Sequence, residues 1–407
     1  MTAEARSLPL AFTAKGIALN VRALASQAVW WGDDRVALVF DPGGLDADER
    51  RALERLPAGR CLPLRPAQHG PGGMPVGERA LEPQESQEWL LICRGRDLGS
   101  LRSEHPLGEH LLAAQAALER PPREPQLMGV INVTPDSFSD GGLYLDPQRA
   151  IERGLALEAD GASLLDVGGE STRPGASPVP LAVELERVLP VVRGLVRSCG
   201  ADISIDTTKS EVARAALDAG ATWVNDVSAG RRDPRMLALV AAREAVFVAV
   251  HSQGDPADMQ VDPRYRDPVA EIARFLRERV ADCLKAGIEP SRIVLDPGIG
   301  FGKRLEHNLV LLRRLPELRS LGQPLLLGVS RKAFIGHLSG AEKQGDWKDR
   351  ESRDRPVDRL GGTAAAVTAC VLEGVEFLRV HDVRVMAEAA RVARGIAGFQ
   401  PLPSPPR

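Results

Sequence analysis

Residues 202–226 read DISIDTTKSEVARAALDAGATWVND, and this stretch decides the fold. It opens with a short apolar run at 202–206, continues with helical spacing over 210–219, and returns to an apolar run at 221–225. Gly220 stands where the helix should end, the usual place for a glycine cap. Such short apolar runs are typical of strands buried on both faces of a parallel sheet. The stretch therefore predicts a strand–helix–strand unit with parallel strands.

The same unit repeats along most of the chain. Apolar runs of strand length occupy 127–131, 163–167, 202–206, 221–225, 246–250, 292–296, 325–329 and 375–380. Helical spacing lies between them at 148–160, 210–219, 268–286 and 363–373, followed by Gly161, Gly220, Gly287 and Gly374. Eight strands alternating with helices over about 270 residues predict a (β/α)8 TIM barrel. A doubly wound sheet is the alternative, but no GxGxxG follows the first strand.

A proline-rich stretch, RPPREPQL at 120–127, marks a domain boundary. It separates an N-terminal appendage of unknown function, residues 1–120, from the barrel, residues 121–407. Within the barrel, residues 341–359 are dense in charges of both signs, which is typical of a solvated surface loop.

The appendage has a different pattern from the barrel. ALVFD at 37–41 and WLLIC at 89–93 predict strands, and 108–119 predicts a helix. The segment 58–88 is rich in Pro, Gly and Gln, so we expect a loop there. Together these features predict a small α/β region.

Composition excludes several classes of function. The 52 basic and 55 acidic side chains nearly balance, which argues against a nucleic-acid or anionic-membrane binder. No apolar run reaches the roughly 18 to 20 residues of a membrane span, and the N-terminus shows no secretory signal. The five cysteines are scattered and odd in number, so we expect neither a disulfide framework nor a zinc site, and we expect a cytoplasmic protein.

Polar side chains follow all eight apolar runs. They are Asn132, Asp166, Asp206, Asn225, His251, Asp296, Ser330 and Arg379, with Lys332 and His381 shortly after the last two. In a (β/α)8 barrel the carboxyl ends of the strands meet on one face, where active sites are built. One such residue alone is usually a helix cap or a buried structural group. Eight at the same end indicate a functional site.

Three of these residues suit a flat, nitrogen-rich heterocycle. They are Asp206, Asn225 and Asp296. A carboxylate that accepts two N–H groups from a 2-aminopyrimidinone ring fixes the orientation of the ring and contributes binding free energy.

Other residues suit an anion with a metal ion. Arg173, Arg379 and His381 can donate to a diphosphate. Asn132 offers a neutral oxygen to Mg²⁺ that is held mainly by substrate phosphates and water. The segment GIGFGK, 298–303, lacks the spacing of a phosphate-binding P-loop. We expect its glycines to let the backbone turn tightly beside a ligand.

Two loops after the first and second strands are long for a barrel. They span 134–147 and 168–180 and are rich in Gly and Ser. We expect them to be mobile lids that close over the reaction and exclude water.

At these residues the sequence resembles the dihydropteroate synthases, pterin-binding enzymes of folate biosynthesis. The motifs are MGVINVTPDSFSDGG (128–142), LLDVGGESTRPGA (164–176), ISIDTTKSEVARAALDAGATWVNDVSAG (203–230), IVLDPGIGFGK (293–303), GVSRKAFIG (328–336) and LRVHDV (378–383). They stand in the family's order, and the resemblance covers about two thirds of the chain, 127–398.

The resemblance implies a (β/α)8 fold and a transferase. The family joins 6-hydroxymethyl-7,8-dihydropterin diphosphate to 4-aminobenzoate and releases pyrophosphate. These small molecules are the partners it implies, together with a homodimer formed through barrel helices.

The resemblance also assigns roles to residues. The pterin would be held by Asp206, Asn225, Asp296 and Lys332. The diphosphate would meet Arg379 and His381, with Mg²⁺ served by Asn132. The aminobenzoate would lie near Thr172, Arg173, Ser330 and the ring of Phe301. Catalysis would depend on Asp206, Lys332, Arg379 and His381.

One departure from the family lies at the fifth strand, where the usual MHMQG is replaced by VAVHSQGD with Val250 and Ser252. Two alternative functions remain open from the residues. One is a corrinoid-dependent methyltransferase that shares the barrel and the pterin-binding acids. The other is a non-catalytic pterin-binding paralogue.

Overall fold

The computed structural model describes residues 22–23, 35–40, 60–63, 89–94, 124–134, 146–171, 178–254, 259–339 and 359–397. The described strands belong to two compact units. One unit contains strands β1 to β4, and the other contains strands β5 to β12.

The N-terminal unit contains an antiparallel sheet in the order β1-β2-β4-β3. Its strands are β1 (Arg22–Ala23), β2 (Arg35–Phe40), β3 (Arg60–Pro63) and β4 (Trp89–Arg94). The strands predicted at 37–41 and 89–93 are confirmed. The expectation of a loop throughout 58–88 is wrong at β3, where four residues pair with β4 although proline and glycine dominate the flanking sequence. The helix predicted at 108–119 lies outside the described residues.

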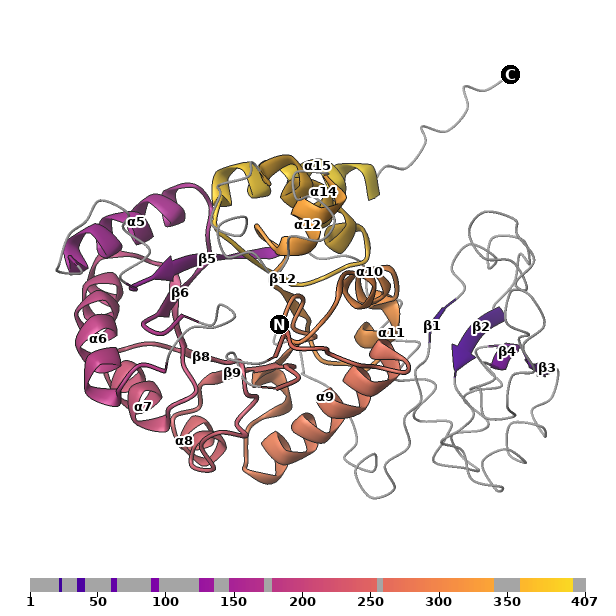
Figure 1. Ribbon diagram of the computed structural model, residues 1–407, viewed down its shortest axis with the longest axis horizontal. Coiled ribbons are helices and arrows are strands. Elements are labelled where there is room, and N and C mark those ends of the chain that lie inside the picture. The colour runs from indigo at the N-terminus through magenta and orange to yellow at the C-terminus, as the bar shows by residue number, and fades with distance from the viewer. Residues whose placement is uncertain are drawn as a thin grey trace, which may run out of the picture. The chain divides into compact units, whose positions relative to one another are not determined.

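The second unit is the predicted barrel (Figure 1). Its strands are β5 (Gln126–Asn132), β6 (Leu164–Gly168), β7 (Asp202–Asp206), β8 (Trp223–Asp226), β9 (Val246–Val250), β10 (Ile293–Asp296), β11 (Leu326–Leu327) and β12 (Phe377–Val380). They pair in parallel in the order β10-β9-β8-β7-β6-β5-β12-β11. A parallel bridge between Leu295 and Leu325 joins the two end strands and closes the sheet on itself. The (β/α)8 prediction is therefore confirmed.

Helices cover the outside of this sheet (Figure 1). The described helices are α5 (Pro147–Ala159), α6 (Leu181–Ser198), α7 (Ser210–Asp218), α8 (Met236–Ala242), α9 (Pro268–Lys285), α10 (Leu305–Arg313), α11 (Leu315–Arg319), α12 (Ala333–Leu338), α14 (Leu360–Leu372) and α15 (Val383–Ala397). Among these helices, none is long and apolar enough to cross a membrane. The four predicted helices are present, and their boundaries differ from the predicted ones by up to three residues.

Glycine ends the four predicted helices as expected. Gly161, Gly220, Gly287 and Gly374 have φ angles of 108°, 107°, 92° and 76°. These left-handed angles are strained for residues with a Cβ. The glycines turn the chain from each helix towards the next strand.

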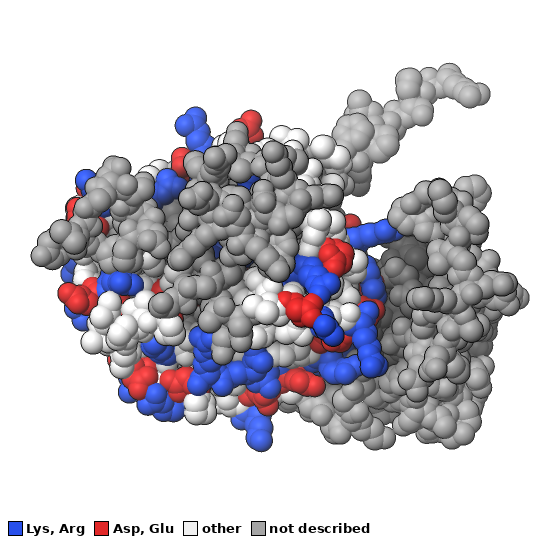
Figure 2. All heavy atoms as spheres, viewed as in Figure 1, with Lys and Arg blue, Asp and Glu red and all other residues white. Residues whose placement is uncertain are grey.

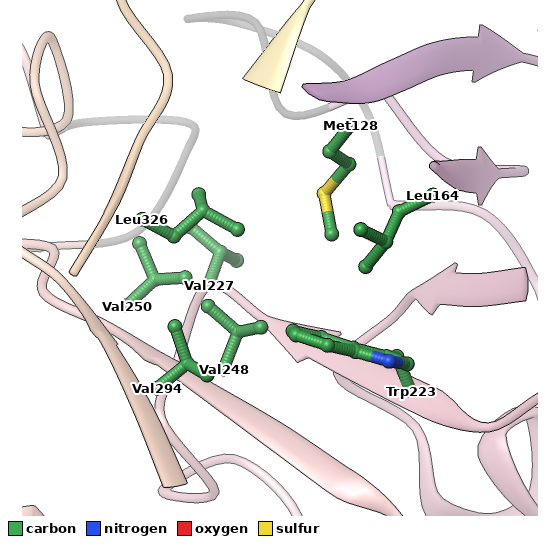
Figure 3. Packing of buried hydrophobic residues seen from close by; sticks show 8 residues of the cluster. All are labelled: Met128, Leu164, Trp223, Val227, Val248, Val250, Val294 and Leu326. Atoms are coloured by element: carbon green, nitrogen blue, oxygen red, sulfur yellow. The ribbon is translucent and has the colours of Figure 1, made fainter. Parts of the chain in front are cut away.

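The barrel interior is packed with apolar side chains (Figure 3). The cluster consists of Met128, Leu164, Trp223, Val227, Val248, Val250, Val294 and Leu326. Phe377 packs against it, and its ring meets that of Trp223 edge to face at 5.1 Å. The cluster fills the barrel beneath the carboxyl ends of the strands, so the barrel is a closed core rather than a pore.

Strand periodicity places polar side chains directly above this cluster. Alternate residues of a strand face the same side. Asp166, Asn225 and Asp296 each stand two residues after a member of the cluster, and Arg379 stands two residues after Phe377. They therefore face the barrel interior at its carboxyl end.

The surface of the barrel unit mixes charges of both signs (Figure 2). Several are paired, such as Arg235 with Glu211, and Arg243 with Asp218. Exposed pairs of this kind contribute little to stability.

Candidate active site

Arg379 lies at the centre of the polar end of the barrel. Its Nε donates to Asp166 Oδ2 over 2.7 Å, and its Nη2 donates to Asp206 Oδ2 over 2.9 Å. Asn225 Nδ2 also donates to Asp166 Oδ2, at 3.0 Å. One guanidinium from β12 thereby holds carboxylates from β6 and β7 in place. Among the described residues, Asp166 Oδ1 is buried and has no hydrogen-bond partner.

Asp206 titrates near neutral pH. Burial and then the neighbouring Asp166 charge raise its pKa to about 7, against the opposing charge of Arg379. A carboxyl with this pKa can be present in either protonation state under physiological conditions.

Asp296 and Lys332 form the second charged group of the site. Asp296 Oδ1 accepts a hydrogen bond from the Gly298 amide at 2.6 Å. Burial raises the pKa of Asp296 to about 6, although this bond and the charge of Lys332 oppose the rise. Burial likewise lowers the pKa of Lys332 to about 8, opposed by Asp296. The Lys332 ammonium lies 4.0 Å from the centre of the Phe301 ring, a cation–π contact.

The segment 298–303 turns tightly, as its glycines predict. Gly298, Gly300 and Gly302 have φ angles of 69°, 83° and 61°. A Cβ at Gly298 would overlap the carbonyl oxygen of His251. Only glycine therefore lets this turn pack so closely against the end of β9.

Side chains hold the backbone of this turn on several sides. Gly300 lies between two of them: its amide donates to Asn308 Oδ1 at 2.8 Å, and its carbonyl accepts from Gln260 Nε2 at 2.5 Å. Lys303 Nζ donates to the Phe301 carbonyl at 3.0 Å, and Tyr265 Oη donates to the Gly302 carbonyl at 2.9 Å. The Phe301 ring itself packs against the interior cluster. These hydrogen bonds hold the backbone of the turn in place and thereby fix the position of Phe301.

Lys303 is a site residue that the sequence reasoning missed. Its side chain is buried, and its Nζ lies 3.0 Å from His251 Nδ1. Burial lowers the pKa of Lys303 well below its ordinary range. Burial and the nearby Lys303 charge also lower the pKa of His251 well below its ordinary value. The only signal for Lys303 was its place after the glycines.

A second polar network lies at the start of the long loop after β6. Thr207 Oγ1 donates to the buried Glu184 Oε1 at 2.6 Å. Lys209 Nζ pairs with Glu184 at 2.5 Å and also with Glu170. Glu170 is thereby tied to helix α6. No sequence pattern predicts this network, because an acidic residue in the first turn of a helix, as Glu184 is in α6, is ordinary.

Ser330 and His381 are directly joined. Ser330 Oγ accepts from the His381 amide at 3.2 Å and lies 3.0 Å from His381 Nδ1. Burial lowers the pKa of His381 to about 3, helped by the charges of Arg379 and Arg331. The lowered pKa favours the neutral form of the ring.

Asn132 ends β5 on the interior side and is half-buried. Its neighbour in the sheet register is Gly168, which in turn pairs with Asp206. No hydrogen bond joins its side-chain amide to another residue in the described part of the chain. The amide oxygen is thus free to serve as a ligand at the polar end of the barrel.

The structure brings most of the predicted site residues to one end of the barrel. They are Asn132, Asp206, Asn225, Asp296, Phe301, Ser330, Lys332, Arg379 and His381. Thr172 and Arg173 lie outside the described residues, as do most of the loop at 134–147, the middle of the loop at 168–180 and nearly all of the charged segment 341–359. The sequence places Asp166 at a strand end but does not reveal its contact with Arg379.

Known proteins share this barrel. The sequence profile of a family described as pterin binding enzyme matches residues 128–381. A dihydropteroate synthase of Mycobacterium leprae is 47% identical over 270 residues, which make up 66% of this chain and 92% of that protein. A Xanthomonas albilineans dihydropteroate synthase structure with 4-aminobenzoic acid gives a TM-score of 0.62 at 44% identity, over 68% of this chain and 94% of that one. A structure of that organism's enzyme with 7,8-dihydropteroate gives a TM-score of 0.59 at 40% identity, over 69% of this chain and 96% of that one.

Proposed function

Because the chain belongs to the pterin binding enzyme family, we infer that it catalyses the dihydropteroate synthase reaction. It is a transferase that joins 6-hydroxymethyl-7,8-dihydropterin diphosphate to 4-aminobenzoate and releases pyrophosphate. The observation that carries this function is the convergence of Asp206, Asp296, Lys332 and Arg379 at one end of the barrel.

In our proposal the pterin lies among Asp206, Asn225, Asp296 and Lys332. The pterin ring presents several N–H donors, and each carboxylate can accept two of them in one plane. Lys332 donates to a ring acceptor. Burial strengthens these bonds because little water competes for them.

The diphosphate faces Arg379 and His381. Asp166 and Asp206 occupy Nε and Nη2 of Arg379, and Nη1 has no partner in the described part of the chain. Arg379 can therefore donate to the diphosphate without leaving the carboxylates. Its charge stabilises the negative charge that grows on the leaving oxygen.

The reaction exchanges one bond for another at the pterin methylene carbon. The C–O bond breaks, and its electron pair leaves with the diphosphate oxygen. The aromatic amine donates its lone pair to form the C–N bond and then releases one proton. Positive charge on the methylene spreads into the ring, where Asp206 and Asp296 stabilise it. The protein contributes positioning and electrostatics without a covalent enzyme intermediate.

The second substrate, 4-aminobenzoate, lies beside Phe301, with Thr172 and Arg173 nearby. The braced turn at 298–303 supports one face of the aromatic ring. An apolar ring stacked there presents its amine towards the methylene carbon.

Mg²⁺ fits the donors at this end of the barrel. Asn132 supplies a neutral amide oxygen that has no hydrogen-bond partner among the described residues, and the diphosphate would supply the remaining charge. The described residues hold no group of three or more His, Cys, Asp or Glu side chains that could bind a metal alone. When bound, Mg²⁺ neutralises charge on the leaving diphosphate.

We also propose a cytoplasmic homodimer. The described cysteines Cys199, Cys283 and Cys370 are free thiols, which suits a reducing compartment. Helices α12, α14 and α15 lie together (Figure 1). These helices expose large apolar side chains. These are Leu338, Leu360, Leu372, Val385, Val392 and Ile396. A second copy of the chain would cover them.

One assay tests the catalytic proposal. The full chain is mixed with the pterin diphosphate, 4-aminobenzoate and Mg²⁺, and dihydropteroate and pyrophosphate are measured. We expect equal amounts of both. Folded protein that makes neither would contradict the proposal. Methyl transfer from a methylated folate would support the methyltransferase alternative, although neither of the enzymes compared above is named as one.

A further inference from the structure

We propose that Ser330 is a positioning residue that fixes His381 in its neutral form with the proton on Nε2. The inference rests on the proposed function, because it assigns the free Nε2–H of His381 to the substrate diphosphate. It also gives Ser330 a different task from the aminobenzoate contact that the family resemblance implies.

The hydrogen bonds around Ser330 determine where its proton goes. Ser330 is 5% exposed, and its hydroxyl accepts a hydrogen bond from the backbone N–H of His381 at 3.2 Å. Its own proton needs an acceptor, and His381 Nδ1 at 3.0 Å is its only partner in the described part of the chain. The hydroxyl therefore donates to Nδ1, and Nδ1 carries no proton.

The charges that face His381 keep the ring neutral. Three cations, Arg379, Arg331 and Lys332, act on it, with Asp382 as the opposing anion. A further positive charge on the imidazole would be buried among them. A neutral ring whose Nδ1 accepts must carry its proton on Nε2.

The backbone on both sides of the pair is held firmly. Arg331 adopts a left-handed conformation with φ of 57°, and its amide donates to Thr363 Oγ1 at 3.2 Å. Its guanidinium binds both oxygens of Asp382, at 3.0 and 2.5 Å. Arg153 Nη2 donates to the His381 carbonyl at 2.8 Å. These contacts hold the segment after β11 and the segment after β12, and thereby fix the distance between Ser330 and His381.

This arrangement leaves one useful atom on the ring. Among the described residues, His381 Nε2 has no hydrogen-bond partner, and its N–H can donate to an oxygen of the diphosphate. Ser330 uses its hydroxyl proton and one oxygen lone pair in its two hydrogen bonds to His381. A group that sets a histidine tautomer acts through the histidine and not on the substrate directly.

The test compares Ser330→Ala with Ser204→Ala in the full chain. Ser204 is a buried serine of β7 whose hydroxyl has no hydrogen-bond partner in the described structure, so it is a matched control. Binding of inorganic pyrophosphate with Mg²⁺ is measured by calorimetry, and KM is measured for each substrate. We expect Ser330→Ala to weaken pyrophosphate binding and raise KM for the pterin diphosphate about tenfold, the effect of one lost hydrogen bond to a charged group. KM for 4-aminobenzoate should stay unchanged, and Ser204→Ala should change none of the three.

A rise in KM for 4-aminobenzoate with unchanged pyrophosphate binding would overturn the proposal. The unaltered chain gives a second measurement that needs no variant and no activity. Nitrogen-15 NMR of its imidazoles should show the His381 proton on Nε2, and a proton on Nδ1 would also overturn the proposal. If the chain makes no dihydropteroate, the proposed function fails while the NMR result on His381 still stands or falls by itself.

Discussion

Arg379 Nη2 donates to Asp206 Oδ2 over 2.9 Å, so one guanidinium from β12 fixes an acid of β7 across the end of the barrel. The same guanidinium holds Asp166 of β6 through Nε. Two buried carboxylates side by side would repel each other strongly without it. Asp206, which we propose binds the pterin, is therefore positioned before any substrate arrives.

The raised pKa of Asp296 predicts how stability changes with pH. Its carboxyl has a pKa of about 6 in the folded protein, above its ordinary value. The folded protein retains a proton that the unfolded chain releases, so this stabilising contribution is present at acid pH and is lost as pH rises from about 4 to about 6. The contribution amounts to about 3 kcal/mol.

Asp296→Asn should remove this dependence. We expect the free energy of unfolding at pH 8 to rise by about 1–2 kcal/mol relative to the unaltered chain, since a neutral amide replaces a buried charge. Turnover should fall far more than stability changes. Urea titrations from pH 4 to pH 8 check the first statement. Parallel pH curves for the two proteins, or normal turnover in the variant, would contradict the role of Asp296.

Gly298 is required by the backbone of the turn. Gly298→Ala places a Cβ against the His251 carbonyl oxygen at a φ of 69°. We expect a loss of about 2 kcal/mol or more, because the left-handed conformation alone costs about 1–2 kcal/mol. Gly361→Ala is the control, since a Cβ there meets no atom within 4 Å. It should stabilise α14 by about 0.5–1 kcal/mol. Thermal unfolding distinguishes the two, and equal effects would show that the turn is not so tightly held.

Lys303 should act on the second substrate through Phe301. Lys303→Met keeps the length of the side chain but removes the Nζ bonds to the Phe301 carbonyl and to His251. We expect kcat/KM for 4-aminobenzoate to fall about tenfold, the effect of one buried hydrogen bond. KM for the pterin diphosphate should change less. Lys285→Met, at the exposed end of α9, should leave both unchanged. An unchanged kcat/KM for 4-aminobenzoate in Lys303→Met would show that Lys303 does not act through Phe301.

The proposed homodimer predicts that α15 contacts a second copy. Val392 and Ile396 are 59% and 65% exposed and lie one helical turn apart. Replacing both with Asp should halve the mass measured by light scattering, because it buries charge in the interface. Val261→Asp changes an equally apolar residue, 76% exposed, outside these helices, and should leave the mass unchanged. A monomeric unaltered chain would refute the dimer.

The sequence predicted the parts of the site that depend on periodicity. Parallel strands repeat with a period of two, so the residues that end them face one another, as Asp206 and Asn225 do in register. The pairing of Arg379 with Asp166 depends on the conformation of a long side chain that extends from β12 to β6. No pattern in the sequence predicts that conformation.

Lys303 and β3 were missed for related reasons. The direction of Lys303 is set by three left-handed glycines, and their spacing reveals a turn but not which way it points. The β3 strand is four residues long and stands among prolines and glycines. In both cases the deciding contacts come from segments distant in sequence.

Binding of the pterin diphosphate tests the central claim most directly. The full chain, Asp206→Asn and Asp296→Asn are each titrated with this substrate and Mg²⁺ by calorimetry at pH 8. We predict that each substitution weakens binding at least tenfold, because each removes a charged acceptor of ring N–H groups. Equal affinity in all three folded proteins would place the heterocycle elsewhere and contradict the account.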